Sequence, residues 1–446
     1  MNWFACRPGS IGTALRLRKL DTIDLSCACF LPRLENAVSF SAEMSQDQKA
    51  MMLNPHILTW SRETAGLSVD DAAHALGFKD AHYRTAAERL QAMEDGKEEP
   101  SRSVLLKMAQ TYHRSLLVFY LSEPPRAGDR GQDFRRAPGQ KPPAYDPTLD
   151  ALIRDIRGRQ IVIRDLLEQA DPGKVDYVAS ASIDVPHAEL AHRINDRLGF
   201  SLTEFRKKAD EGAAFAYLRE KVEASGAFVL LLGNLGSHHT NIGSDVFRGY
   251  AIADPVAPFI VVNDQDAHVA WAFTVLHEMT HLWLGETGVS GDSADTNIES
   301  YCNSVAGEIL LPETEMNELR LMSRAPLQET IRTISEFARD RKISRAMVAY
   351  KLLRLNIISR ARWQELVKHY EDEWIASRAK QACKDKNHGG PSYYVVKRHR
   401  LGHALLDLVK NSLADGFLTH TKAGQILGVK PRNVDPLISA AGMRGG

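Results

Sequence analysis

Several features are missing from this chain of 446 residues, and each absence excludes a class of protein. Its five cysteines are scattered and form no Cys-x-x-Cys pair, so a disulfide framework is not expected and a reducing compartment is the simpler interpretation. No apolar run reaches the roughly 18 residues that a membrane span needs. The first residues also lack the apolar stretch of a secretory signal. These absences predict a cytoplasmic protein that does not enter a membrane.

The chain has no net excess of charge of either sign, and one region contains no Lys or Arg at all. The 56 Lys and Arg residues balance the 56 Asp and Glu residues, so no global field directs the chain to nucleic acid or to a membrane. Residues 260–319 contain 11 acidic residues and no Lys or Arg. Such a segment favours a divalent cation and a basic or unfolded peptide, whereas it would repel a phosphate backbone. This argues against a nuclease.

The organisation of the chain is uneven. Its 44% hydrophobic and 25% charged residues are typical of a folded globular protein, and the length predicts two or three domains. Residues 1–50 show no sustained period and are expected to be a disordered or mis-annotated extension, with the true start at one of three methionines, Met44, Met51 or Met52. Short helices with tight turns predict a helix-turn-helix domain over 51–122, and Pro and Gly make 123–148 a linker.

The largest expected domain, 149–385, mixes helices with a few strands. Runs rich in Val, Ile and Phe predict strands at 227–232, 247–253 and 259–262. Apolar periodicity predicts helices at 149–167, 188–198, 264–284, 296–311 and within 329–367. The fold class is therefore α+β and mainly helical, with a small β-sheet after the helix-turn-helix bundle.

A C-terminal helical segment is expected at 391–446. It has 8 Lys or Arg residues against 3 acidic residues, so it is more basic than the rest of the chain. Lys397, Arg398 and Arg400 are expected to lie on a solvated face of a helix.

One short motif indicates chemistry. The sequence His277-Glu278-Met279-Thr280-His281 matches H-E-x-x-H. Residues four apart lie on one face of a helix, about 6 Å apart along its axis. Two imidazoles placed in this way can share one zinc ion at about 2.0–2.1 Å each. Glu278 then flanks the metal without binding it and can act as the general base of a hydrolysis.

Such a motif can match by chance, and the alternative is a pair of core histidines hydrogen-bonded to their neighbours. The flanking residues 270–276 and 282–284 are mostly apolar, so we expect the helix to be buried. Three buried polar side chains need partners, because burying them alone is costly. A metal ion binds the two histidines directly and holds the water on which Glu278 acts, and a further helix with an acidic first turn follows in the chain.

That next helix offers a third ligand. Glu299 and Asn303 share one of its faces, and the neighbouring stripe is apolar. This predicts Glu299 as a metal ligand and Asn303 as a partner that orients a ligand. Glu299 could instead stabilise the helix dipole. Other acidic candidates for the ligand are Glu286, Asp292, Asp295 and Glu308. Cys302 is expected to be a buried structural cysteine.

These segments resemble a known family. The resemblance lies in FTVLHEMTHLWLG and ESYCNSVAGEILLP, which are similar to the ImmA/IrrE family of metallo-endopeptidases. It implies a zincin-like peptidase domain with one zinc ion per chain, the ligands His277, His281 and Glu299, and the base Glu278. The segment from LTWSRETAGLSVDDAAHALGF to FYLSEPP resembles the XRE-type helix-turn-helix region often fused to this peptidase. The similarity spans about residues 55–440.

The helix-turn-helix region departs from its family in charge. Residues 51–110 contain 7 Lys or Arg residues against 9 Asp or Glu residues. Arg84, Arg89 and Lys97 are the candidates for contacting DNA. Because phosphate contacts supply much of the affinity for DNA, only weak DNA binding is expected.

The expected function is therefore that of a zinc endopeptidase acting on a protein partner. The resemblance implies that this partner is a DNA-binding repressor of a mobile element or a stress response. Two alternatives are a DNA-binding regulator with a structural or sensory metal site, and a non-catalytic, antitoxin-like binding module. Glu278 favours the peptidase, because a purely structural metal site needs no base.

Overall fold

The computed structural model describes most of the chain after its first 51 residues, namely 52–125, 132–133, 146–170, 173–290, 297–319, 325–385 and 392–439. The chain divides into two units, 1–51 and 52–446, and only the second contains described residues. The expectation for residues 1–50 therefore lies outside the described part. Within that part, no helix is both long and apolar enough to cross a membrane.

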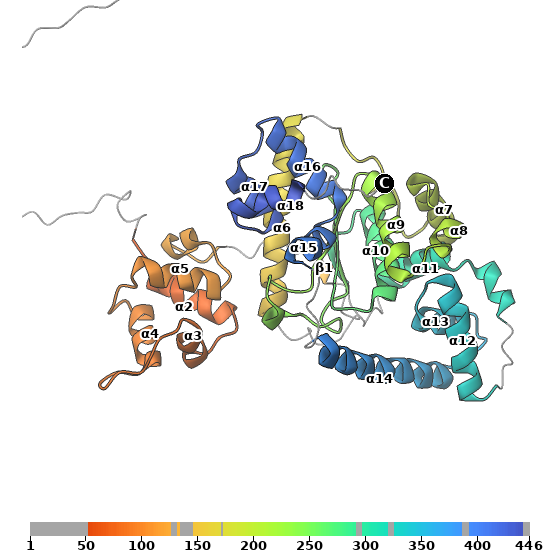
Figure 1. The fold of residues 1–446 in the computed structure, drawn as a ribbon, viewed down its shortest axis with the longest axis horizontal. Helices are drawn as coiled ribbons and strands as arrows, with labels where there is room; N and C mark the ends of the chain where they lie inside the picture. The colour runs from red at the N-terminus through yellow and green to blue at the C-terminus, as the bar shows by residue number, and fades with distance from the viewer. Residues whose placement is uncertain are drawn as a thin grey trace, which may run out of the picture. The chain divides into compact units, whose positions relative to one another are not determined.

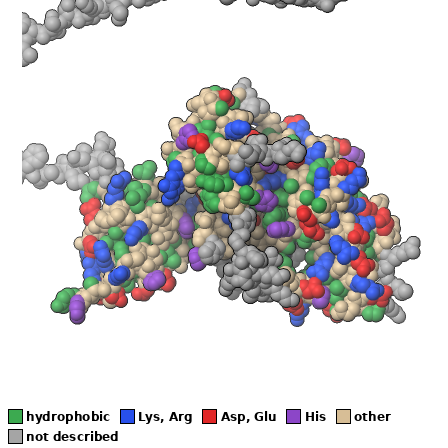
Figure 2. Space-filling model, viewed as in Figure 1, with side chains coloured by type: hydrophobic (Ala, Val, Ile, Leu, Met, Phe, Trp, Pro, Cys, Tyr) green, Lys and Arg blue, Asp and Glu red, His purple; other side chains and the backbone are tan. Residues whose placement is uncertain are grey.

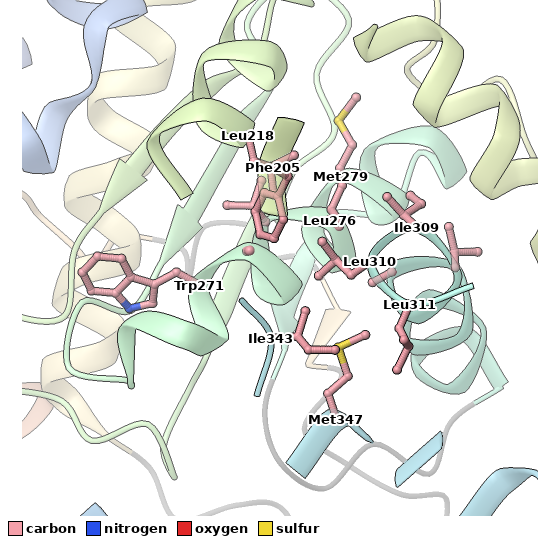
Figure 3. Packing of buried hydrophobic residues seen from close by; sticks show 14 of the residues in the cluster. Phe205, Leu218, Trp271, Leu276, Met279, Ile309, Leu310, Leu311, Ile343 and Met347 are labelled. Carbon is pink, nitrogen blue, oxygen red and sulfur yellow. The ribbon is translucent and has the colours of Figure 1, made fainter. Parts of the chain in front are cut away.

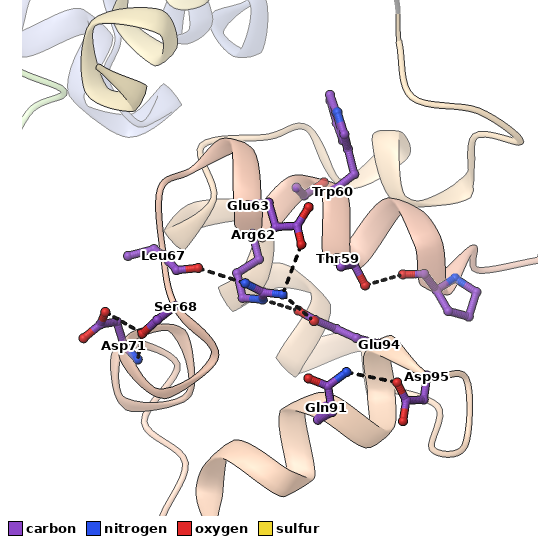
Figure 4. A network of polar contacts seen from close by, with 12 residues as sticks. Thr59, Trp60, Arg62, Glu63, Leu67, Ser68, Asp71, Gln91, Glu94 and Asp95 are labelled. Carbon is purple, nitrogen blue, oxygen red and sulfur yellow. Dashed lines mark hydrogen bonds and ion pairs between the residues drawn. The ribbon is translucent and has the colours of Figure 1, made fainter. Parts of the chain in front are cut away.

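The first described elements form a bundle of short helices: α2 (Pro55–Thr64), α3 (Val69–Ala75), α4 (Ala86–Glu94), α5 (Arg102–Thr111) and the 3-10 helix η1 (Leu116–Tyr120). Asn54, Ser68 and Thr85 begin the first three helices, because each side chain accepts a hydrogen bond from a backbone N–H of the first turn. The bundle has its own hydrophobic core. Within it, the Arg62 guanidinium pairs with the Glu94 carboxylate (Figure 4).

A small mixed sheet organises the larger region. Its order is β1-β5-β3-β4-β2, with bounds β1 (Gln132–Asp133), β2 (Phe228–Leu231), β3 (Gly249–Ile252), β4 (Phe259–Val262) and β5 (Gly288–Ser290). Strand β3 runs antiparallel to β4 and β5, whereas β2 is parallel to β4 and β1 to β5. The three expected strands correspond to β2, β3 and β4, so the expected α+β, mainly helical fold with a small sheet is confirmed. The short strands β1 and β5 were not expected.

The sheet is covered on both faces, which explains its continuous apolar strands. Along β4, Ile260 and Val262 face one core, and Phe259 and Val261 face another. Figure 1 shows α9, α10 and α11 on one side of the sheet and α6 with α15–α18 on the other. The helices of the first side are α7 (His187–Leu198), α8 (Leu202–Arg206), α9 (Glu211–Ala224), α10 (His268–Leu284), α11 (Asn297–Leu310), α12 (Leu327–Arg341), α13 (Arg345–Arg354) and α14 (Arg360–Asp385).

The first core fixes α10 from several directions. Leu276 and Met279 of this helix pack among apolar side chains of α8, α9, α11 and α13 (Figure 3), including Phe205, Leu218, Ile309 and Met347. The helix ends at Gly285, whose φ of 76° is a left-handed conformation that glycine adopts without strain. The polar side chains of α10 are therefore held inside a packed core.

The second core contains α6 (Pro147–Ala170) together with the C-terminal helices α15 (Tyr393–Leu401), α16 (His403–Ala414), α17 (His420–Leu427) and α18 (Val434–Ser439). The remaining short turns are the 3-10 helices η2 (His238–Thr240), η3 (Glu313–Glu318) and η4 (Pro431–Asn433). The buried Arg219–Glu223 pair of α9 attaches this segment, because Glu223 accepts the backbone N–H of His403 at 3.1 Å. The expected domain borders, 51–122, 149–385 and 391–446, stay predictions.

The basic residues of α15 are not on a fully solvated face, so that expectation is wrong. Arg400 Nη2 lies 2.6 Å from Asp264 Oδ2, in the loop between β4 and α10. Lys397, Arg398 and Arg400 are all partly buried. Elsewhere, acidic and basic side chains are interspersed over the visible surface (Figure 2), as the balanced net charge suggests.

Candidate metal centre

Helix α10 brings the two expected histidines together. His277 and His281 are one turn apart, and their Nε2 atoms lie 3.1 Å from each other. The side chains are buried, with exposed fractions of 5% and 0%. The four-residue spacing therefore gives two imidazoles that converge on one point inside the core, as a shared metal requires.

Helix α11 supplies a carboxylate to the same point. Glu299 Oε2 lies 3.1 Å from His277 Nε2, and Glu299 Oε1 lies 3.0 Å from His281 Nε2. Ligand atoms at about 2.0–2.1 Å from a tetrahedral zinc ion lie about 3.3 Å apart, so these separations are close to those of a ligand triangle. Two imidazoles and one carboxylate are also a donor set of catalytic zinc sites. The residues present thus fit the ion.

The other acidic candidates are placed less favourably. Glu308 lies 2.9 Å from Lys351 Nζ and forms an ion pair with it. Glu286 is partly exposed. Asp292 and Asp295 lie outside the described residues. The geometry therefore favours Glu299 among the acidic residues that the structure describes, although its role as a ligand stays a prediction.

Cys302 is a further neighbour of the two histidines. Ligand atoms of His277, His281 and Cys302 all lie within 4.8 Å of one another. The thiolate, and not the thiol, is the metal ligand. Burial raises the pKa of Cys302 well above its usual value, and the nearby carboxylates raise it further. Glu299 is therefore the better third donor, and the expected structural role of Cys302 is retained.

Glu299, His277 and His281 influence each other's pKa values. Burial alone would raise the pKa of Glu299, but the adjoining imidazoles outweigh it and lower the pKa to about 2. Burial lowers the pKa of His281. It acts downward on His277 as well, but there the Glu299 carboxylate outweighs it and the pKa is raised. An ionised carboxylate facing two imidazoles is a favourable environment for a divalent cation.

Asn303 contacts the first histidine from α11. Its Oδ1 lies 3.0 Å from His277 Nδ1. With the Nδ1 proton donated to this amide oxygen, Nε2 keeps its lone pair for a metal. The structure thus places Asn303 where a residue that orients His277 has to be.

Glu278 lies beside the ligand triangle and is completely buried. Neither of its carboxylate oxygens has a hydrogen-bond partner with good geometry among the described residues. Burial raises the pKa of this carboxyl group to about 8, against the opposing effects of His277 and of the nearby Ser290 hydroxyl, which lower it. A buried carboxyl group without partners is costly, and such groups are concentrated at functional sites.

Two further residues of the site were not expected from the sequence. A Cβ atom on Gly249 of β3 would lie 2.1 Å from Glu278 Oε1, so only glycine leaves room for this carboxylate. Ser290 of β5 places its Oγ 3.4 Å from His281 Nε2. A glycine inside an apolar strand signals close approach by another group and could have indicated the first. Nothing in the local sequence indicates the second.

The candidate DNA-contacting residues lie in the N-terminal bundle and face carboxylates. Arg84 Nη1 is 2.6 Å and Arg89 Nε is 3.6 Å from Glu98. Lys97 Nζ is 2.7 Å from Asp95 Oδ2. Their charges are therefore partly neutralised within the bundle.

Comparison with known families gives a match to one part of the larger region. Residues 237–353 match the family model described as the IrrE N-terminal-like domain, Peptidase_M78. The chain contains an IrrE N-terminal-like domain. This metallopeptidase-family match includes β3, β4, α10 and α11, and therefore every residue of the candidate metal centre; it leaves the N-terminal bundle uncovered. No curated protein and no solved structure matches the chain.

Proposed function

We propose that this chain is a zinc-dependent endopeptidase that hydrolyses peptide bonds of a protein partner. One observation carries the proposal: the imidazoles of His277 and His281 converge with the Glu299 carboxylate at 3.0–3.1 Å, beside the fully buried carboxyl group of Glu278. The metallopeptidase-family match over 237–353 supports it.

The residues have distinct tasks in this mechanism. His277, His281 and Glu299 would hold the zinc ion, and Asn303 orients His277. When bound, zinc acts as a Lewis acid that polarises the scissile carbonyl and makes water a stronger nucleophile near neutral pH. Glu278 takes the proton from the attacking water and passes it to the leaving amine. A carboxyl group next to the bound water is within reach of both protons, which is what general acid–base catalysis requires.

The substrate is a protein with a basic or unfolded segment. Residues 260–319, which contain the metal centre, have 11 acidic residues and no Lys or Arg, so a cationic peptide is attracted there. A DNA-binding repressor, the substrate that the family resemblance implies, has this chemistry. The alternatives are a regulator with a sensory metal site and an antitoxin-like binding module, and both would function without a base at position 278.

The Glu278→Gln variant tests the proposal. Glutamine keeps the size of the side chain but cannot accept the proton, so cleavage should fall by roughly 10²–10⁴-fold while zinc content stays at the wild-type level. The variant should retain its substrate, which can be recovered by pull-down, identified by mass spectrometry, and then digested with the wild-type protein. Glu286→Gln is the matched control and should cleave normally.

A cellular comparison separates the peptidase from its alternatives. A strain with Glu278→Gln should show the phenotype of a deletion strain. If Glu278→Gln behaves as wild type while His277→Ala fails, the metal is structural or sensory and the chain is not acting as a peptidase.

A further inference from the structure

A second polar site includes elements of the second core and lies away from the metal centre. Helices α6 and α15 contribute Arg154, Asp155, Arg159, Lys397 and Arg400 to the lining of one pocket. The loop after β2, Gly428 at the end of α17 and seven residues of the N-terminal bundle between Ala109 and Pro125 complete the lining. Four cationic side chains and only one carboxylate therefore come from the two helices, which is an unusual concentration in a chain with no net charge.

Arg159 is the most informative of these residues. It is only 9% exposed, and its Nη2 donates to Asp155 Oδ2 at 2.5 Å. Its Nε and Nη1 atoms have no hydrogen-bond partner in the described part of the chain. A buried guanidinium with unused N–H groups is costly unless an acceptor completes its environment.

Arg157, Arg206 and Arg398 each leave one buried guanidinium nitrogen without a partner among the described residues, whereas Arg159 leaves two, and the equally buried Arg219 leaves none. Arg219 is 5% exposed, and it donates to the Glu223 carboxylate and to the backbone carbonyls of Val229 and His399. The hydrogen-bonding groups of Arg219 are thus used by acceptors within the protein. Arg159 differs because part of its hydrogen-bonding capacity is left for something that binds.

Lys397 adds a second cation to the same wall. Burial, together with the neighbouring Arg159 and Arg400, lowers the pKa of this ammonium group to about 8, whereas Asp155 acts in the opposite direction. The group is therefore surrounded by more positive than negative charge. Arg400 has a partner of its own, Asp264, at 2.6 Å.

We propose that this pocket binds a small molecule that carries a phosphate group, with Arg159 and Lys397 as its principal contacts. A guanidinium offers two parallel N–H donors that match phosphate oxygens, and an ammonium group adds a point charge. Because the Arg159 side chain is about nine-tenths buried, the phosphates of a rigid DNA duplex would not reach it. A small anion can enter, which is why a metabolite is favoured over a nucleic acid.

The position of the pocket connects it to the metal centre. Arg400 of its wall holds Asp264, just before α10, and the ring of His399 lies 6.0 Å from that of Trp271 on α10. The helix that lines the phosphate pocket is thus in contact with the helix that carries the metal ligands. Binding itself does not depend on the proposed peptidase activity.

Calorimetric titration of the zinc-loaded full chain tests the site, with inorganic phosphate and adenosine monophosphate as separate probes. Wild type should bind at least one of them saturably. Tighter binding of inorganic phosphate would indicate free phosphate as the ligand, and tighter binding of adenosine monophosphate would indicate a phosphorylated metabolite. Arg159→Met and Lys397→Met should each weaken binding by roughly tenfold or more, which corresponds to the loss of one charged hydrogen bond. Arg164→Met is the matched control: it lies on the same helix, pairs with Glu168 and Asp254, and should bind as wild type.

A melting experiment without phosphate gives an independent readout. Arg159→Met should melt at or above the wild-type temperature, because it removes a buried charge that is incompletely paired. Binding that survives both pocket substitutions would place the anion elsewhere, for example at the zinc ion, and would overturn the proposal. Absence of binding to wild type would overturn it as well, as would displacement of the probe by a short DNA duplex.

Discussion

Two buried clusters of charged side chains differ in how completely their members find hydrogen-bond partners within the cluster. In the N-terminal bundle, Arg62 Nε and Nη2 donate to the two oxygens of Glu94 at 2.8 and 3.0 Å, and Nη1 donates to the carbonyl of Leu67 at 2.9 Å (Figure 4). The hydrogen bonds that Arg62 donates to Glu94 raise the pKa of Arg62. This cluster closes on itself and needs nothing from outside.

The metal centre also consists of buried charged and polar side chains, but they do not all pair with one another. Its carboxylate and imidazoles also meet at hydrogen-bond distance, yet Glu278 beside them is fully buried and its oxygens make no hydrogen bond of good geometry in the described structure. A cluster that fully pairs its charges is explained by stability alone. A cluster that leaves one buried acid unpaired indicates a ligand, because the cost of burial has to be offset by binding or function.

The largest expected effect concerns zinc itself. Purified wild type should contain about one zinc ion per chain, and His277→Ala, His281→Ala or Glu299→Ala should weaken zinc binding by more than the roughly 100-fold that marks the loss of an outer partner. Metal analysis and a chelator competition would measure this.

The matched controls for the third ligand are Glu286→Ala, Asp292→Ala and Asp295→Ala, which should retain zinc. If one of these removes the metal and Glu299→Ala does not, the ligand assignment is wrong. A folded wild type without zinc would contradict the conclusion that the metal centre, unlike the Arg62–Glu94 cluster, needs a ligand from outside.

The same substitution in both clusters sharpens the comparison. Glu94→Gln leaves Arg62 buried without its counter-charge and should destabilise the bundle by about 3–5 kcal/mol. In the metal-free protein Glu278, whose pKa is raised to about 8, is mostly protonated near neutral pH, so Glu278→Gln exchanges one neutral group for another and should cost little or nothing. Denaturant unfolding, with hydrogen exchange of α2 and α4 to localise the change, would measure the difference.

Equal losses of stability in the two Glu→Gln variants would show that the clusters do not differ in the way described. A further control is the double variant Arg62→Met with Glu94→Leu, which replaces the pair by apolar side chains. It should recover most of the stability that Glu94→Gln loses, because replacing both members of a buried pair is often neutral.

Much of this architecture follows from local sequence. The bounds of β4 agree with the expectation, and α11 differs from it by one residue at each end, because apolar periodicity and the stop signals Gly285 and Pro312 are local. The H-E-x-x-H spacing places two imidazoles on one face of any helix, so their proximity could also be expected. Glu299 could be singled out because it shares a helix face with Asn303.

The rest depends on contacts between distant segments. Strand β5 is a run of three residues, Gly288–Ser290, whose extended form comes from pairing with β3 and not from its own propensity. The space for Glu278 depends on Gly249, which is 29 positions away in the sequence. The basic residues of α15 look like a solvated face until the partner Asp264 and the walls of α6 are known. No periodicity within one segment contains such information.

A smaller effect is expected from Asn303→Ala. The loss of its contact with His277 Nδ1 would leave the imidazole less well oriented, and zinc affinity should fall by roughly 10–100-fold. Ser304→Ala is the control, since the Ser304 hydroxyl donates to the Ser300 carbonyl within α11 and does not serve the site. If both variants bind zinc as wild type does, Asn303 is not an orienting partner.

The smallest effects are expected at the exposed ion pairs of the N-terminal bundle. Glu98 lies near both Arg84 and Arg89, and its side chain is 33% exposed, so removing it should change stability by no more than about 1 kcal/mol. Wild type should also bind duplex DNA only weakly at physiological salt.

Glu98→Gln frees Arg84 and Arg89 from their carboxylate. If these arginines face DNA, the affinity for DNA should rise by a few fold, and its salt dependence should become steeper by up to about two phosphate contacts. Glu99→Gln removes the same charge from an exposed neighbour without freeing either arginine. Equal binding by the two variants would show a general charge effect and exclude Arg84 and Arg89 as DNA contacts, whereas nanomolar binding by wild type would favour the regulator over the peptidase.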